Sequence, residues 1–208
     1  MQYLKYLKSI GTERPDSLEK RARAIIVKYS MLLDPHGSPP SNLPAAHKDL
    51  RQAVYLIDNT IESTAKKPVQ YGGLREWLYY RKARILAVFA PETIPGVIAA
   101  MEQEFPDSRL LPNAMAEELY GEGLIMRNLR AAQSTFQKLV DKYPTSNAID
   151  NAYTWMAIIF HCQGRVEDAQ RMDREITRRF PLTRHAAYAQ KRMASPKADS
   201  CPVQGREQ

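Results

Sequence analysis

The stretch DKYPTSNAIDNAY, residues 141–153, decides the fold, because two other stretches of the chain repeat its pattern. QEFPDSRLLPNAM (103–115) and RRFPLTRHAAYAQ (178–190) have the same aromatic residue before a proline, the same small hydroxyl residue and a later alanine. The three prolines are spaced by 38 and 37 residues, and an alanine follows each proline by eight residues. A period between about 20 and 50 residues is typical of stacked repeat proteins.

Apolar residues recur at helical spacing along the whole chain, and no alternating strand pattern persists. The periodicity therefore predicts an all-α protein. We expect helices over residues 2–9, about 17–33, 45–66, 74–90 and 91–105, with breaks at DPHGSPPSNLP (34–44) and KPVQYGG (67–73), and then alternating helices and turns to about Ala194.

The clearest repeat places two small residues at a regular distance. Ala157 and Ala169 are twelve residues apart, Pro181 follows after twelve more, and Gly164 marks a turn between the two alanines. A small residue on each helix lets two helix axes approach closely. The proline ends the second helix, because the residue before a proline is pushed out of the α region.

These spacings resemble the tetratricopeptide repeat, in which two antiparallel helices meet at small residues. The preceding copy fits in its second helix, but Tyr120 stands where its first helix would have a small residue. The resemblance implies a right-handed stack of antiparallel helical hairpins. The longer period and the aromatic-Pro-x-Ser motif resemble repeats of bacterial cell-envelope proteins, among them lipoproteins that assist outer-membrane protein assembly and periplasmic partners of the Tol–Pal system.

On this basis the chain divides into three parts. Residues 1–104 form a degenerate helical-hairpin region, 105–195 form the repeats with a terminal capping helix, and 196–208 form a flexible tail.

No arrangement of residues indicates catalysis, a metal or another cofactor. The four histidines, His36, His47, His161 and His185, lack ligand spacing. His161 and Cys162 are neighbours, so a helix directs their side chains about 100° apart, and we expect Cys162 to be buried or to line a groove. The glycines of LYGEGLI (119–125) follow no strand, and they either allow a close helix approach or end a helix.

Two surfaces are candidates for binding a partner. The resemblance implies a concave groove lined by the first helix of each hairpin, here Asn151, Thr154, Ile158, His161, Glu117 and Leu124. The Lys/Asn pattern with which some such domains hold a terminal carboxylate is not reproduced.

The second surface is a basic face formed by Arg171, Arg174, Arg178, Arg179 and Arg184. It can be a solvated helix face with internal ion pairs, a docking site for an acidic protein surface, or a site for nucleic-acid phosphates. The formal net charge of +7 is compatible with all three interpretations.

We therefore expect a non-catalytic protein–protein interaction scaffold or adaptor that binds another protein or peptide. Two alternatives are a basic adaptor subunit that binds nucleic acid and a helical regulatory part of a larger enzyme or complex. The first residues resemble no signal peptide, and two cysteines are too few for a disulfide framework. The expected compartment is the cytoplasm for the sequence as given, or the periplasm or envelope if a signal has been trimmed.

Overall fold

A computed structural model of the protein describes residues 43–66, 68–194 and 201. Within these residues it contains helices and no strand, which confirms the all-α class. The helices are α3 (Leu43–Thr64), α4 (Pro68–Phe89), the 3-10 helix η1 (Pro91–Thr93), α5 (Ile94–Glu104), α6 (Leu111–Tyr120), the π-helix η2 (Gly121–Ile125), α7 (Leu129–Lys142), α8 (Ile149–Cys162), α9 (Val166–Arg179) and α10 (Arg184–Ala194).

Four expectations fall wholly or mainly outside the described residues, and one other is wrong. The helices expected over 2–9 and 17–33, most of the break over 34–44 and the tail except Cys201 lie outside them. The break expected over 67–73 is instead the first part of α4. A proline is tolerated in a first helical turn, and burial of Tyr71 between α3 and α4 outweighs the low helix propensity of the two glycines after it.

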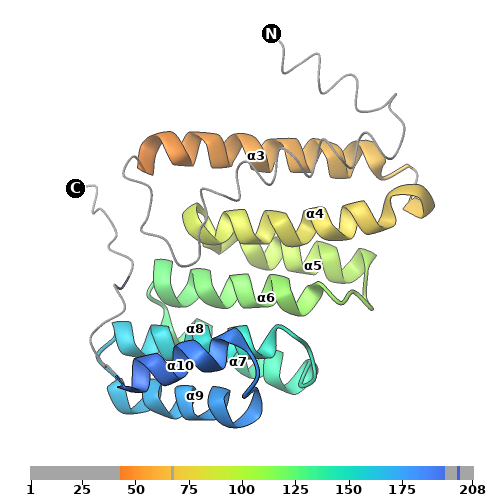
Figure 1. Ribbon diagram of the computed structural model, residues 1–208. Helices are drawn as coiled ribbons and strands as arrows, with labels where there is room; N and C mark the ends of the chain where they lie inside the picture. The colour runs from red at the N-terminus through yellow and green to blue at the C-terminus, as the bar shows by residue number, and fades with distance from the viewer. Residues whose placement is uncertain (1–42, 67, 195–200, 202–208) are drawn as a thin grey trace.

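Figure 1 shows the helices as a stack, with α3 at one end and α9 and α10 at the other. In this stack α4, α6, α8 and α10 form a row, in which each helix packs against the next, and α3 packs against α4. We call these four the row helices. The intervening helices α5, α7 and α9 each pack against the row helices that precede and follow them in the chain.

The three proline motifs end α5, α7 and α9 in the same way. Phe105, Tyr143 and Phe180 have φ values of −133°, −131° and −130° and ψ values of 66°, 48° and 47°. Each N–H still donates to the carbonyl four residues earlier, at 2.8 to 2.9 Å. The aromatic residue therefore closes the last turn and then leaves the α region, as the following proline requires.

The hydroxyl residue of each motif organises the turn into the next row helix. Ser108, Ser146 and Thr183 donate their N–H groups to the carbonyls of the preceding aromatic residues, at 3.0, 2.9 and 3.0 Å. Their side-chain oxygens accept hydrogen bonds from N–H groups two or three residues further on, at 3.0 to 3.3 Å. The hydroxyl thus satisfies a donor that no helical carbonyl reaches.

Small residues lie where the helices meet. Ala114, Ala152 and Ala189, the alanines eight residues after the prolines, are completely buried in α6, α8 and α10. Ala157 and Ala169 are buried in α8 and α9, which pack against each other. The predicted close contact between these helices is therefore confirmed.

The turn between α8 and α9 contains Gly164, whose φ of 74° lies in the left-handed region. The N–H of Arg165 donates to the carbonyl of Phe160 at 2.9 Å, which closes the end of α8. Glycine adopts this backbone conformation without the penalty that a side chain would impose.

The glycines of η2 allow close approach between helices. A Cβ atom on Gly121 would lie 2.6 Å from the Cβ of Pro91, and one on Gly123 would lie 2.1 Å from Cδ1 of Ile159. Real Cβ atoms do not approach other atoms this closely. Of the two explanations for these glycines, the structure confirms close approach, and α6 also ends directly before them, at Tyr120.

Two apolar cores run along the stack. A smaller one, with Leu50 and Ile57 at its centre, joins α3 to α4. A larger one extends from Ala83 in α4 to Ala189 in α10. The larger core crosses residues 104 and 105, where the expected domain boundary lies.

We predict that Gly123→Ala lowers the free energy of unfolding by about 1–3 kcal/mol, because the new methyl group overlaps the buried Ile159 side chain. Gly73→Ala is the control: Gly73 is exposed in α4 and a Cβ there meets no atom within 4 Å. That substitution should raise the free energy by about 0.5–1 kcal/mol. Urea denaturation measures both values, and equal effects would contradict the close approach at η2.

Candidate partner-binding surfaces

Three of the residues predicted to line the groove are half-buried on α8. Asn151, Ile158 and His161 retain part of their surface in contact with solvent. The neighbouring turns of α8 are almost entirely buried, because α8 packs against α6, α7, α9 and α10. The accessible part of this helix is therefore narrow, and these three residues occupy it.

Two predicted groove residues, Thr154 and Leu124, are buried and do not belong to the accessible surface. Thr154 donates to the Asp150 carbonyl at 2.9 Å, and its Oγ1 lies 3.2 Å from Nδ1 of His185 in α10. Leu124 belongs to η2 and to the larger core. The prediction that Thr154 lines a groove is wrong, because α10 packs against α8.

Glu117, the remaining groove residue, pairs with a row helix. Its Oε1 lies 4.0 Å from Nε of Arg84 in α4, and its side chain is mostly buried. Burial raises the pKa of Glu117, and the charges of Arg84 and Arg81 oppose that rise. Glu117 therefore links α6 to α4, and only a small part of its side chain remains accessible to solvent.

The acidic residues after Glu117 are also in a low-polarity environment. Burial, together with the negative charge of Glu122, raises the pKa of Glu118 to about 7. Burial likewise raises the pKa of Glu122, against a hydrogen bond from Thr135 and the charge of Lys138. These carboxyl groups are on α6 and η2.

The row helices also carry aromatic residues that the sequence interpretation did not select. The Arg81 guanidinium lies 5.2 Å from the Trp77 ring centre and 5.8 Å from that of Tyr80, all in α4. The Tyr120 ring meets Trp155 edge to face at 4.8 Å, joining α6 to α8. For Trp77 and Tyr80 the signal in the sequence is the aromatic run EWLYY, residues 76–80.

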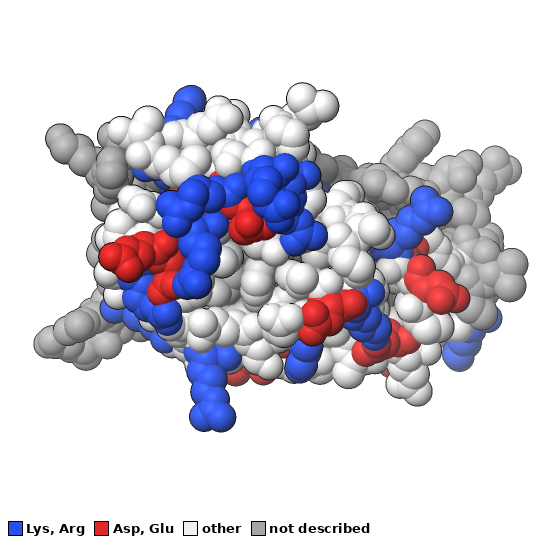
Figure 2. Space-filling model, turned by 90° about the horizontal axis from the view of Figure 1, so that it is seen from below, with Lys and Arg blue, Asp and Glu red and all other residues white. Residues whose placement is uncertain are grey.

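The basic face is divided by internal pairing. Arg171 pairs with Asp168, and Arg178 pairs with Glu175 at 2.7 Å, both within α9. Exposed pairs of this kind contribute little to stability, because solvent screens the two charges. Figure 2, which views the end of the stack opposite α3, shows acidic side chains interspersed among the basic ones.

The other three arginines of the predicted face differ among themselves. Arg179 donates to the Tyr153 hydroxyl at 2.6 Å and lies over that ring, so it holds α9 against α8. Arg174 and Arg184 are exposed and pair with no acidic residue within the described ranges. Arg174 and Arg184 are therefore the exposed arginines of the predicted face that have no acidic partner among the described residues.

A buried ion pair fixes the last two helices. Nη2 of Arg192 in α10 lies 2.5 Å from Oδ1 of Asp173 in α9, and both side chains are largely inaccessible. Neither residue is among those that the sequence analysis selected. Nineteen residues separate them, which is beyond the spacing at which one helix pairs its own side chains.

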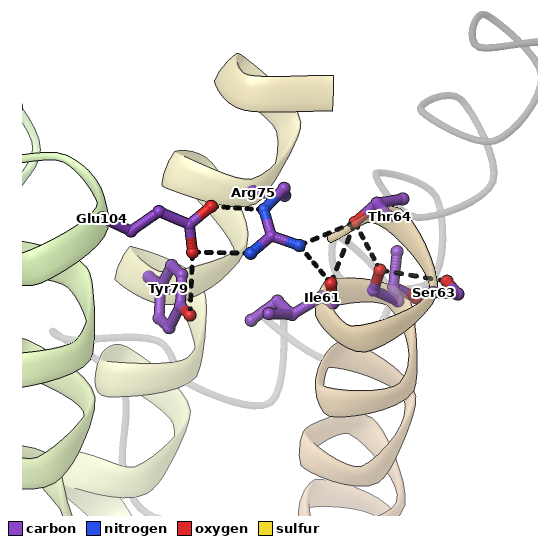
Figure 3. Close-up of polar contacts among 7 residues, drawn as sticks. Ile61, Ser63, Thr64, Arg75, Tyr79 and Glu104 are labelled. Atoms are coloured by element: carbon purple, nitrogen blue, oxygen red, sulfur yellow. Dashed lines mark hydrogen bonds and ion pairs between the residues drawn. The ribbon is translucent and has the colours of Figure 1, made fainter. Parts of the chain in front are cut away.

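A second buried pair lies at the other end of the stack, where Arg75 of α4 joins two neighbouring helices (Figure 3). Its guanidinium donates to both carboxylate oxygens of Glu104 in α5, at 2.5 and 2.6 Å, and to the Ile61 carbonyl in α3. The Tyr79 hydroxyl donates to the same carboxylate at 3.2 Å. The Arg75 hydrogen bond holds the pKa of Glu104 below its usual value. We interpret this network as structural, because its donors and acceptors are satisfied by one another.

Cys162 and Cys201 form a disulfide, with Cα atoms 5.5 Å apart and a sequence separation of 39. This corrects the interpretation of Cys162 as only a buried or groove-lining thiol. It joins the end of α8 to the segment after α10. Two cysteines far apart in the sequence gave no local signal for this bond.

Neither a metal centre nor a membrane span is found in the described part of the chain. No group of three His, Cys, Asp or Glu residues there could hold a metal ion. None of the helices over residues 43–66 and 68–194 combines the length and apolar character that crossing a bilayer requires. Comparisons of the chain with protein-family models, curated proteins and solved structures found no match.

We predict that Glu104→Gln lowers the free energy of unfolding by about 1–3 kcal/mol at neutral pH, because it leaves the buried Arg75 charge uncompensated. Because the pKa of Glu104 is depressed in the folded chain, its contribution is present above the unfolded pKa and is lost as the pH falls through the folded pKa. The difference between wild type and variant should therefore shrink in acid.

The matched control is Glu102→Gln on the same helix. Glu102 pairs with Lys142, but both side chains are about half exposed, so the loss should stay below about 1 kcal/mol. Replacing the pair by Arg75→Met/Glu104→Leu should recover most of the stability lost in Glu104→Gln. Equal losses for Glu102→Gln and Glu104→Gln in denaturation curves would contradict the assigned role of the Arg75 network.

Proposed function

We propose that this protein is a non-catalytic scaffold or adaptor of the tetratricopeptide type, which binds a peptide or another protein. The observation that supports this proposal is the row of helices α4, α6, α8 and α10, in which each helix packs against the next. In a right-handed stack of antiparallel hairpins, one layer of helices lies on the inner, concave side. The row helices are the candidates for that layer, and α5, α7 and α9 are candidates for the outer one.

The equal geometry of the three joints supports this arrangement. Phe105, Tyr143 and Phe180 differ by only a few degrees in φ, so successive units meet the next row helix through the same turn. A rigid surface loses little conformational entropy when it binds an extended partner, which suits a scaffold.

The binding surface that we assign to this function lies on the row helices. Asn151, Ile158 and His161 supply an amide, an aliphatic side chain and an imidazole from α8, and Glu117 supplies a carboxyl group from α6. The half-buried Tyr80 and Trp77 of α4 add aromatic area. Mixed apolar and polar residues of this kind are typical of sites that bind peptides.

A photo-crosslinking residue introduced at Ile158, in cells that make the protein naturally, tests this function. We expect specific adducts with one or a few proteins. The same residue at Gln133, exposed on α7, is the control and should give none of these adducts. Identical adduct patterns at the two positions, or none at Ile158, would refute binding at the row helices.

We further propose that the protein acts in an oxidising compartment such as the periplasm, in place of the cytoplasm expected from the sequence as given. The reason is the Cys162–Cys201 disulfide, since such bonds persist mainly outside the reducing cytoplasm.

Thiol titration of the denatured protein, isolated from its natural source with free thiols blocked during lysis, tests the compartment. We expect no reactive thiol before reduction and two after it, because the sequence contains only these two cysteines. Two free thiols before reduction would place the protein in a reducing compartment.

A further inference from the structure

The outward face of α10 carries an unusual set of exposed residues. Arg184, Ala187, Tyr188 and Lys191 are exposed, and they follow one another at the spacing that keeps residues on one side of a helix. The opposite side contains the buried residues of α10. With Leu182, which lies just before the helix, we call these four residues the α10 stripe.

Leu182 is 99% exposed, the highest value among the large hydrophobic residues described as exposed. The Thr183 hydroxyl accepts the Ala186 N–H at 3.3 Å, as a helix-capping residue does. A hydrophobic residue directly before such a cap commonly packs against the fourth helical residue, here Ala187. Ala187 is itself exposed, and Leu182 remains in water. Removing a leucine side chain from water is favourable, so this position gains from an apolar contact with a partner.

The cations of the α10 stripe are not neutralised by the described part of the chain. Arg184 and Lys191 form no ion pair there, and the first turn of α10 contains no acidic residue. Arg184 stands at the first position of α10, where the helix dipole disfavours a positive charge. By contrast, Arg171 and Arg178 in α9 each have an acidic partner.

We propose that the α10 stripe binds an acidic, amphipathic segment of a partner protein. Arg184 and Lys191 pair with carboxylates of that segment, and Leu182 and Tyr188 contact an apolar side chain between them. The inference rests on the proposed function as a protein-binding scaffold and adds a second surface with a defined partner chemistry. The formal net charge of +7 favours approach of such a segment from solution.

The same observations favour a protein over a nucleic acid. Binding to a phosphate backbone commonly neutralises about 6–10 phosphates, which needs a corresponding number of available cations. The stripe has two, and Arg171 and Arg178 of α9 are already paired with acidic residues. A fully exposed leucine also adds nothing to the binding of phosphates.

A displayed library of random short peptides, selected on the full chain, tests this proposal. We expect enrichment of peptides that combine Asp or Glu with Leu or Phe. Fluorescence anisotropy with the synthesised peptides should give a Kd that rises about tenfold or more in Arg184→Gln/Lys191→Gln and also in Leu182→Ser. The matched control Arg171→Gln/Arg178→Gln removes the same charge from paired residues and should change the Kd less than about twofold.

The other outcomes overturn the proposal in distinguishable ways. Peptides that ignore the α10 variants but are lost in Ile158→Glu would refute the stripe and leave the proposed function intact. Binding of single-stranded RNA or anionic vesicles that depends on Arg184 and Lys191, with no acidic peptide enriched, would assign the stripe to phosphates instead. A selection that enriches no peptide would count against both the stripe and the scaffold.

Discussion

The arrangement of the described helices depends on one steric rule: a residue that precedes proline cannot remain comfortably in the α-helical region. Pro106, Pro144 and Pro181 impose this rule at nearly equal intervals, and each time the aromatic residue before the proline leaves the α region with a similar backbone conformation. Each of the three turns leads into the next row helix. Buried alanines then bring the row helices into contact.

Ion pairs between the helices fix the relative positions of helices that apolar packing holds together. The Arg75–Glu104 pair joins α4 to α5, and the Asp173–Arg192 pair joins α9 to α10. An apolar interface tolerates sliding by a turn, whereas a buried guanidinium needs its carboxylate in one place. The two pairs lie near opposite ends of the described stack.

The hydrophobic period and the proline motifs were sufficient to predict the helical class, the buried alanines and the turn at Gly164. These features depend on residues close together in the sequence. Local patterns could not reveal contacts between separate helices or segments. These contacts are the burial of Thr154 against α10, the Asp173–Arg192 ion pair and the disulfide. For the same reason the sequence identified the arginines of the basic face but not which of them are neutralised.

The disulfide has a topological consequence. It connects the end of α8 to Cys201, so α9 and α10 lie within a closed covalent loop. A pulling force applied to the C-terminus would pass from Cys201 to Cys162 and enter the molecule at α8, bypassing the last two helices. These helices, with the α10 stripe on their surface, would therefore carry none of the tension that entered the chain beyond residue 201.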